Sequence, residues 1–331
     1  MGDCLHLFYT SDANYLMPTR VSICSAAVNC SDCSRLVSHI LDCGISDSAW
    51  GDFKSGILVR YPKVRLERHL IDLSRFSNCS AYCGSRATYA RILPPDLIDD
   101  EWCAFVDGDI LFVDDPLKLL AFRDSRCLVI GHRDYVDCAP HEGWEPIKKA
   151  WFEENGFIWN RDQFVCMGFV LMNLKRMREF DFVKKCLAGF ARCTASRSAD
   201  QEVINAVCQG QIGYLPDPWG EFDLGLFCHL EKPSCIHFVY EKPWTLKPAW
   251  TKALSDAHRL WITYARRYAG YAYGDCVFAS RKVYYKRRLI AEVYRCMRHF
   301  QTQKVKKTTK WRLLDGWFAR RRVYRGLIKI R

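Results

Sequence analysis

The sequence lacks the long apolar runs of an integral membrane protein. No uninterrupted apolar stretch reaches the roughly 18 residues that a transmembrane helix needs. The N-terminus also lacks a basic region followed by an apolar segment and a small-residue cleavage site, the pattern of a secretory signal. We therefore expect a cytoplasmic protein without a transmembrane helix.

Low-complexity segments and internal repeats are also absent. Hydrophobic residues make up 49% of the chain and charged residues 26%, a composition that excludes disorder for most of it. The 331 residues suffice for one large domain or two smaller ones.

Cysteine is abundant, yet its pattern does not indicate a disulfide framework. The chain has 18 cysteines, and several lie in apolar runs, such as Cys103, Cys127, Cys166 and Cys208. In a long chain without a secretory signal, we expect such residues to be reduced thiols that pack as small hydrophobes. Cys30 and Cys33 form one CxxC pair without the second pair that would make a strong zinc signature.

The positive charge is concentrated at the C-terminal end. The whole chain carries +12, but residues 281–331 hold 18 Lys/Arg against 2 Asp/Glu, a net of +16, which leaves −4 for residues 1–280. Residues 281–300 also follow the pattern of an amphipathic helix, and an aromatic stripe follows them. The sequence therefore predicts a slightly acidic body with a basic, helical C-terminal extension.

Strand-like and helix-like segments alternate along the body, which predicts an α/β domain with a mainly parallel sheet. We expect strands at residues 5–10, 56–60, 64–70, 102–112, 127–132, 164–174 and 236–238, and helices at residues 15–28, 87–93 and 199–207, with the prolines at 94 and 95 ending the second helix. Ligands of such sheets bind beyond the carboxyl ends of the strands.

Two carboxylates, Asp107 and Asp109, interrupt the apolar run at residues 102–112. Side chains two apart on a strand point to the same side, so both can face one divalent cation. Burial of unpaired carboxylates is costly, and a cation is the simplest partner for two of them. The alternative is a turn at a strand end with two solvated acids.

Seven blocks, in order, give the chain a resemblance to the retaining glycosyltransferases of family 8. They are TSDANY (10–15), TYARILPPDLI (88–98), FVDGDILFVDD (105–115), GFVLMNLKRMRE (168–179), ADQEVIN (199–205), LPDPWGEFD (215–223) and HFVYEKPW (237–244). The resemblance implies the GT-A fold, a Rossmann-like α/β fold, for a catalytic domain at residues 1–250. Residues 251–331 would then form a basic and aromatic helical region.

The resemblance also implies a metal site. Asp107 and Asp109 match the family's DxD motif, and His237 matches its third metal ligand. One imidazole with two carboxylates favours Mn²⁺ over Mg²⁺, which stays the alternative ion. A lone histidine on a strand is otherwise more often structural.

Other residues match the family's contacts to the nucleotide-sugar donor. The resemblance places Asp12, Asn14 and Tyr15 in the uridine-binding loop with Thr10, although an Asx-rich helix cap would use the same residues. Gly108 would let the backbone approach the ribose. The remaining predicted donor contacts are Arg91, Asp134 and Lys242.

Asp200 and Gln201 match the pair beside the anomeric carbon of the donor sugar. Glutamine is a poor nucleophile, which favours attack by the acceptor on the same face that the diphosphate leaves. Gln201 would stabilise positive charge at the anomeric carbon, and Asp200 would bind sugar hydroxyls.

Two positions depart from the family pattern. Cys166 stands where the family often has asparagine, which puts a sugar-hydroxyl contact in doubt. HFVYEKPW is one residue shorter than the usual HFxGxxKPW, and Tyr240 falls near the place of its glycine. This loop is the reason to keep a catalytically impaired, nucleotide-sugar-binding homologue as the alternative function.

We therefore predict a UDP-sugar-dependent, retaining hexosyltransferase that moves glucose or galactose onto a lipopolysaccharide core or a similar, lipid-linked glycan. Residues 281–331 resemble the membrane-attaching tail of bacterial family members, and basic residues with tryptophans suit an anionic membrane surface. The predicted location is the cytoplasmic face of a membrane. Nucleic acid is the disfavoured partner, because no nucleic-acid motif accompanies the charge.

Overall fold

The computed structural model describes residues 3–82, 84–134, 144–193, 199–222, 233–239, 242–245 and 252–272. Among them, no helix combines the length and apolar character required to cross a bilayer. The predicted amphipathic helix at residues 281–300 and the basic region that follows it lie outside the described residues.

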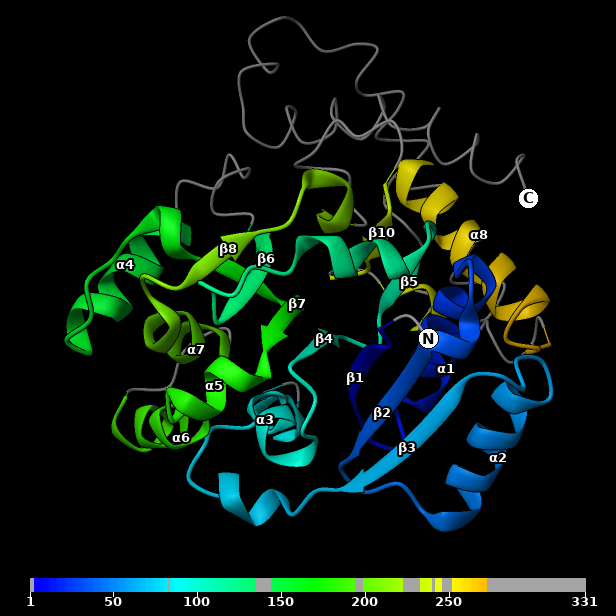
Figure 1. Cartoon of the computed structure of the whole chain (residues 1–331), viewed down its shortest axis with the longest axis horizontal. Helices are drawn as coiled ribbons and strands as arrows, with labels where there is room; N and C mark the ends of the chain where they lie inside the picture. The colour runs from blue at the N-terminus through cyan, green and yellow to red at the C-terminus, as the bar shows by residue number, and fades with distance from the viewer. Residues whose placement is uncertain are drawn as a thin grey trace, which may run out of the picture.

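The described chain contains ten strands and eight α-helices, and Figure 1 shows their arrangement. The strands are β1 (Leu5–Ser11), β2 (Leu36–Asp42), β3 (Arg65–Leu70), β4 (Trp102–Val106), β5 (Ile110–Phe112), β6 (Val129–Arg133), β7 (Val165–Asn173), β8 (Ile212–Tyr214), β9 (Glu221–Phe222) and β10 (Cys235–His237). The helices are α1 (Leu16–Asn29), α2 (Asp47–Leu58), α3 (Pro94–Leu97), α4 (Trp144–Glu154), α5 (Leu174–Glu179), α6 (Phe182–Arg192), α7 (Gln201–Cys208) and α8 (Lys252–Arg267).

Seven strands form a mixed central sheet in the order β3-β2-β1-β4-β7-β6-β8. β7 runs antiparallel to both of its neighbours, and the other four pairings are parallel. A second, three-stranded sheet has the order β5-β10-β9. The arrangement is the GT-A-like α/β fold that the family resemblance implied, with a mixed sheet in place of the mainly parallel one that we expected.

The core lies on both faces of the central sheet, because each strand sends alternate side chains to opposite sides. On β1, Leu7 and Tyr9 join a cluster with α1, α2 and α8, whereas Phe8 joins a cluster with α6 and α7. Figure 1 shows α1, α2 and α8 together at one side of the molecule and α5, α6 and α7 at the other. Helices on both faces leave the loops at the strand ends free to form a site.

One predicted strand is wrong, and three strands of the described chain, β2, β8 and β9, were missed. Residues 56–60 overlap the end of α2, whose side chains Phe53 and Ile57, four residues apart, are both buried. Ser46 caps that helix by accepting a hydrogen bond from the backbone of Ala49. The longest of the missed strands is β2, whose seven residues are all buried although several of them are polar, so the sequence shows no apolar run there.

Two further predictions need correction. Residues 87–92 form a 3₁₀ helix, and Pro94 and Pro95 start helix α3 where we expected them to end one. Proline suits the first helical turn because the N–H groups of that turn have no partner within the helix, so proline loses no hydrogen bond there. The single strand expected at residues 102–112 is divided into β4 and β5 by a turn that contains both predicted acids.

Candidate metal and nucleotide-sugar site

Asp107 and Asp109 lie in the turn between β4 and β5, held by hydrogen bonds to two different sheets. The backbone N–H of Asp107 donates to the carbonyl of Gly168 on β7 at 2.8 Å. The carbonyl of Asp109 accepts from the N–H of Phe238, just after β10, at 3.1 Å. The two carboxylates therefore converge because a turn directs them, not because they alternate along one strand as we predicted.

His237 completes a cluster of three metal-ligating side chains. Its Nε2 lies 3.2 Å from Oδ1 of Asp109 and 3.8 Å from Oδ2 of Asp107. One ligand atom from each residue lies within 4.8 Å of the other two. Oδ1 of Asp109 is buried and accepts no hydrogen bond of normal geometry. A buried oxygen in that state, beside a second carboxylate and an imidazole, fits a divalent cation.

Burial and neighbouring charges set the pKa values of this cluster in different directions. Burial raises the pKa of Asp107 above its usual range, against the opposing pull of Arg91. Burial would also raise the pKa of Asp109, but Lys242 and His237 outweigh it and hold that pKa low. Burial would lower the pKa of His237, yet the Asp109 carboxylate raises it to about 10.

Lys242 reaches the cluster from the chain after β10. Its Nζ pairs with Oδ2 of Asp109 and donates to the carbonyls of Phe238 and Val239 at 2.6 and 3.1 Å. The lysine therefore places a positive charge beside the candidate metal ligands, where a diphosphate would need counter-charges. The loop residues at 240 and 241, including the departure at Tyr240, lie outside the described residues.

Arg91 connects the acid turn to the start of α7. Its guanidinium, only 6% exposed, lies 2.9 Å from Oδ1 of Asp107 and 3.2 Å from Oδ2 of Asp200, and it stacks on the ring of Phe105. Thr88 donates a hydrogen bond of 2.7 Å to Asp200. Burial raises the pKa of Asp200, and Arg91 opposes that rise.

Gln201, the first residue of α7, is held at both ends of its amide. Its Oε1 accepts from the N–H of Met167 at 3.0 Å, and its Nε2 donates to Oδ2 of Asp134 at 2.9 Å. Asp134 in turn pairs with the buried Lys148 at 3.0 Å. The structure thus brings Gln201, Asp200 and Asp134 together beside the acid turn.

The predicted uridine loop lies between β1 and α1, on the same side as the acid turn. Oδ1 of Asp12 accepts from the N–H groups of Asn14 and Tyr15 at 2.9 and 3.1 Å, which is an Asx-turn in the loop; the N-cap of α1 is Tyr15, without a side-chain capping bond. The hydroxyl of Tyr15 lies 3.4 Å from Oδ2 of Asp109, and its ring meets Trp244 edge-on. Oγ1 of Thr10 is buried without a hydrogen-bond partner.

Two glycines stand where no side chain fits. At Gly108 a Cβ would lie 2.6 Å from Oγ1 of Thr19, so this glycine lets the acid turn pack against α1. At Gly168 a Cβ would lie 2.3 Å from Cε1 of His237 and 2.7 Å from Oδ2 of Asp107. β7 therefore passes directly beneath the candidate metal ligands.

Sequence reasoning missed two parts of this site. Lys148 reads as one of two ordinary surface lysines in its helix, and nothing in the sequence marks it as buried. Asn205 is buried, and its amide accepts from the N–H of Val165 and donates to the carbonyl of Val165. The signal that could have found it is its spacing of four residues from Gln201, which puts both on the same helix face. Cys166, the noted departure, lies against His237, and both border a small pocket.

The model of glycosyl transferase family 8 matches residues 6–247, which is most of the chain. The chain belongs to glycosyl transferase family 8. This is a family of retaining glycosyltransferases, and the assignment confirms the resemblance drawn from the seven sequence blocks. No curated protein matches the sequence.

Several solved structures share the fold at low sequence identity. The galactosyltransferase LgtC, in complex with donor and acceptor sugar analogues, has a TM-score of 0.64 and 17% identity, over 85% of this chain and 100% of LgtC. An active-site mutant of LgtC, with glutamate in place of glutamine, has a TM-score of 0.64 and 18% identity. The match covers 79% of this chain and 95% of the mutant's chain. The bifunctional glycosyltransferase WbbM has a TM-score of 0.64 and 18% identity. The match covers 81% of this chain but only 50% of WbbM.

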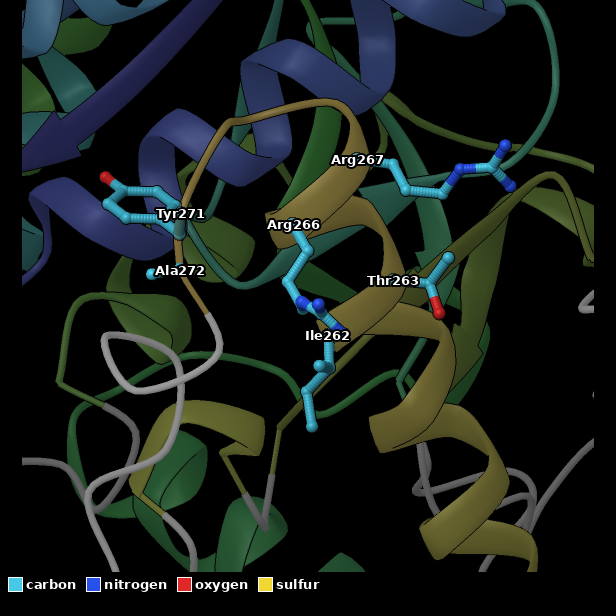
Figure 2. A pocket seen from close by; sticks show the side chains of 6 residues that line it. All are labelled: Ile262, Thr263, Arg266, Arg267, Tyr271 and Ala272. Carbon is cyan, nitrogen blue, oxygen red and sulfur yellow. The ribbon is translucent and has the colours of Figure 1, made fainter.

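A separate hollow lies at the C-terminal end of α8. It is lined by Ile262, Thr263, Arg266, Arg267, Tyr271 and Ala272. Figure 2 shows these side chains around the last turns of α8 and the segment that follows it. None of the predicted site residues belongs to this hollow, so it is distinct from the acid turn.

Proposed function

We propose that this family 8 protein is a UDP-sugar-dependent, retaining hexosyltransferase that uses Mn²⁺. The observation that carries the proposal is the convergence of Asp107, Asp109 and His237 on one point, where Oδ1 of Asp109 is buried and faces Nε2 of His237 at 3.2 Å. A divalent ion bound there would supply Lewis-acid stabilisation of the negative charge on departing UDP. Mg²⁺ is the alternative ion.

The remaining residues have roles that follow from their contacts. Lys242 would balance the charge of the diphosphate, and Arg91 holds Asp107 and Asp200 in place. Tyr15 offers an aromatic face beside the acid turn for the uracil ring, with Thr10, Asp12 and Asn14 in the same loop. Gly108 would lie under the ribose.

We propose same-face transfer of the sugar. The anomeric C–O bond to the diphosphate breaks, a new bond forms to the acceptor oxygen, and the leaving phosphate oxygen takes the acceptor's proton. Gln201 would stabilise positive charge at the anomeric carbon through its carbonyl oxygen, which the N–H of Met167 orients. Asp200 and Asp134 would accept hydrogen bonds from sugar hydroxyls. A glycosyl adduct trapped on Gln201 or Asp200 and detected by mass spectrometry would contradict this route.

The test is UDP release from a panel of UDP-sugars, with the full chain and Mn²⁺. We expect release with UDP-glucose or UDP-galactose, and a loss of about 10²-fold or more in the Asp107→Asn and Asp109→Asn variants. Asp52→Asn, the same change at an exposed position on α2, is the matched control and should keep full activity.

The competing proposal is a catalytically impaired homologue that binds nucleotide-sugar at a membrane. The shortened HFVYEKPW loop favours it. Uptake of Mn²⁺ and UDP measured by calorimetry, without UDP release from any sugar of the panel, would support this alternative. Absence of both metal and UDP binding would contradict both proposals.

We further propose that residues 281–331 attach the protein to the cytoplasmic face of a membrane, where a lipid-linked glycan of the lipopolysaccharide-core type would be the acceptor. The charge of this segment supports the proposal, since each basic side chain near an anionic leaflet contributes about 1 kcal/mol. Co-sedimentation with anionic vesicles should fall when residues 281–331 are removed. Equal pelleting of both forms would exclude this role.

A further inference from the structure

A second group of potential metal ligands lies on one face of the central sheet, at the edge formed by β3. In the sheet register, Phe8 pairs with His39 and His39 pairs with Glu67, so these three side chains share a face. His6 precedes Phe8 by two residues on β1, and His69 follows Glu67 by two on β3, which places both on that face as well.

These side chains form a continuous chain of contacts that ends at a carboxylate on one side. Nε2 of His6 lies 3.2 Å from Oδ1 of Asp100, and Nδ1 of His6 lies 2.9 Å from Nε2 of His39. The other ring nitrogen of His39, Nδ1, lies 3.0 Å from Nε2 of His69 and 3.2 Å from Oε2 of Glu67. His39 is buried at the centre, whereas the Glu67 side chain is 47% exposed.

The positions of the protons in this chain leave one nitrogen of His39 as an acceptor. A carboxylate accepts only, so Nε2 of His6 carries the proton that faces Asp100. Nδ1 of His6 is then an acceptor, and it takes a hydrogen bond from Nε2–H of His39. This leaves a lone pair on Nδ1 of His39, directed at the nitrogen of His69 and the oxygen of Glu67.

We propose that His39, Glu67 and His69 bind a divalent transition-metal ion such as Zn²⁺, at a site separate from the transferase centre. One ligand atom from each residue lies within 4.8 Å of the other two. Two imidazoles and one carboxylate are a common zinc ligand set, in which a water molecule takes the fourth position. Zinc–ligand bonds of about 2.0–2.1 Å at tetrahedral angles separate ligand atoms by about 3.3 Å, close to the two distances measured at His39.

His6 and Asp100 would act as the outer partners of this metal. A ligating histidine usually passes its second ring N–H to a carboxylate or another acceptor, which fixes the tautomer that binds the ion. Here the second ring N–H of His39 donates to His6, and the N–H of His6 donates to Asp100. The ring of Phe8 stacks on His39 with centroids 4.3 Å apart, so the ligand is held in orientation by packing as well.

The electrostatic setting is mixed but permits a cation. Burial and the neighbouring histidines lower the pKa of His39 to about 3, and burial lowers the pKa of His6 and His69. Burial therefore favours the neutral form of the three rings, which is the form that binds metal. Arg65 is the opposing positive charge nearby, and the carboxylates of Glu67 and Asp100 offset it.

The experiment compares metal uptake by the full chain and its variants after treatment with a chelator. Zn²⁺ is titrated by calorimetry into the wild type, Glu67→Gln and His69→Gln. Glu153→Gln on α4 is the matched control, since it removes an exposed carboxylate elsewhere. The site at Asp107, Asp109 and His237 is intact in every form, so differences between the forms report only the new site.

We expect the Glu67 and His69 variants to lose one equivalent of Zn²⁺, or to bind it at least about 10-fold more weakly, while Glu153→Gln behaves as wild type. Co²⁺ provides a second readout, because its visible spectrum distinguishes nitrogen and oxygen ligands from the thiolates of the many cysteines. Equal Zn²⁺ uptake in wild type and Glu67→Gln, or a cobalt spectrum that the two substitutions leave unchanged, would overturn the proposal. Circular dichroism verifies that each variant is folded.

Discussion

Gly168 shows how closely a single residue controls the candidate metal centre. It lies on β7, and its carbonyl accepts the hydrogen bond that fixes the Asp107 backbone. A Cβ at this position would lie 2.3 Å from the His237 ring and 2.7 Å from the Asp107 carboxylate. His237 is buried and cannot move aside without disturbing the sheet, and the Asp107 carboxylate, which is 31% exposed, would have to turn away from the other two ligands.

The substitution Gly168→Ala should therefore disable the site while the chain still folds. We expect Mn²⁺ affinity and UDP release to fall by about 10²-fold, because one methyl group displaces two of the three candidate ligands. Gly51→Ala on α2 is the control, since a Cβ there meets nothing within 4 Å. Normal Mn²⁺ binding by Gly168→Ala would show that this close approach has no role.

His237 gives the metal-free protein a defined dependence on pH. Asp109 raises its folded-state pKa from the ordinary 6.5 to about 10. Such a pair contributes stability that is fully present below pH 6.5 and is lost as pH rises through 10. We expect the wild type to lose its stability advantage over His237→Asn across this window, by on the order of a few kcal/mol.

Urea unfolding in the presence of a chelator, at several pH values between 6.5 and 10, measures this difference. The His237→Asn variant is the reference, because other groups that titrate in this range change both proteins alike. A difference in unfolding free energy that stays constant with pH would mean that His237 is not charged beside Asp109.

The sequence predicted most residues of the candidate site but not the contacts that hold them in place. Asp107, Asp109 and His237 were found by motif, and the structure brings them together. The three side chains converge because the acids lie in a turn and His237 lies on a strand of another sheet. The spacing of residues along one strand predicts neither feature. Lys148 could not be found, because a buried lysine and an exposed one differ only in their tertiary surroundings.

At the scale of elements, one buried lysine joins helix α4 to the rest of the fold. Lys148 is 1% exposed, lies 3.0 Å from Asp134 and 3.7 Å from Glu202, and sits over the ring of Phe164 at 4.1 Å. Removal of one partner from a buried charge network leaves the others uncompensated. The position of α4 next to Gln201 therefore depends on this contact.

The substitution Lys148→Met keeps the length of the side chain and removes its charge. We expect it to lower the free energy of unfolding by about 3 kcal/mol, because two buried carboxylates lose their counter-charge. The neighbouring Lys149 is exposed, so Lys149→Met should change stability by about 0.5 kcal/mol or less. Denaturant unfolding of the two variants provides the comparison, and equal midpoints would refute the role of Lys148.

Strands that are long apolar runs were predicted well, whereas β2 and several amphipathic helices, α6 and α8 among them, were not predicted. The strands at the start of the chain and around residue 170 are long apolar runs, and both are present. β2 was missed because it contains three polar residues, Ser38, His39 and Asp42. Their burial depends on contacts with other strands, which the sequence of β2 alone does not show. Asp42, for example, pairs with Arg68 of β3.

At the scale of the whole molecule, α8 belongs to the core of the described body. Trp261 and Tyr264 are each 1% exposed and join the cluster that contains α1 and β1. Trp261 also packs on Trp244, whose ring meets Tyr15 of the predicted uridine loop. The helix therefore supports the loop that would bind the nucleotide.

A chain that ends at residue 250 should consequently be less stable than one that ends at residue 272. The shorter chain loses two large buried aromatic side chains, each worth about 3 kcal/mol or more. We expect a lower melting temperature and weaker UDP binding for the shorter form. Equal melting of the two forms would show that α8 does not stabilise the body.

The acid turn is fastened by hydrogen bonds to β7 on one side and to the chain after β10 on the other. Lys242, which pairs with Asp109, follows it by 133 positions. During synthesis, a nascent chain that has not yet emerged past that lysine cannot assemble the centre, whatever earlier strands have formed. Binding of a divalent ion at the acid turn would thus report that synthesis has passed residue 242, and a chain that ends earlier would lack the complete centre.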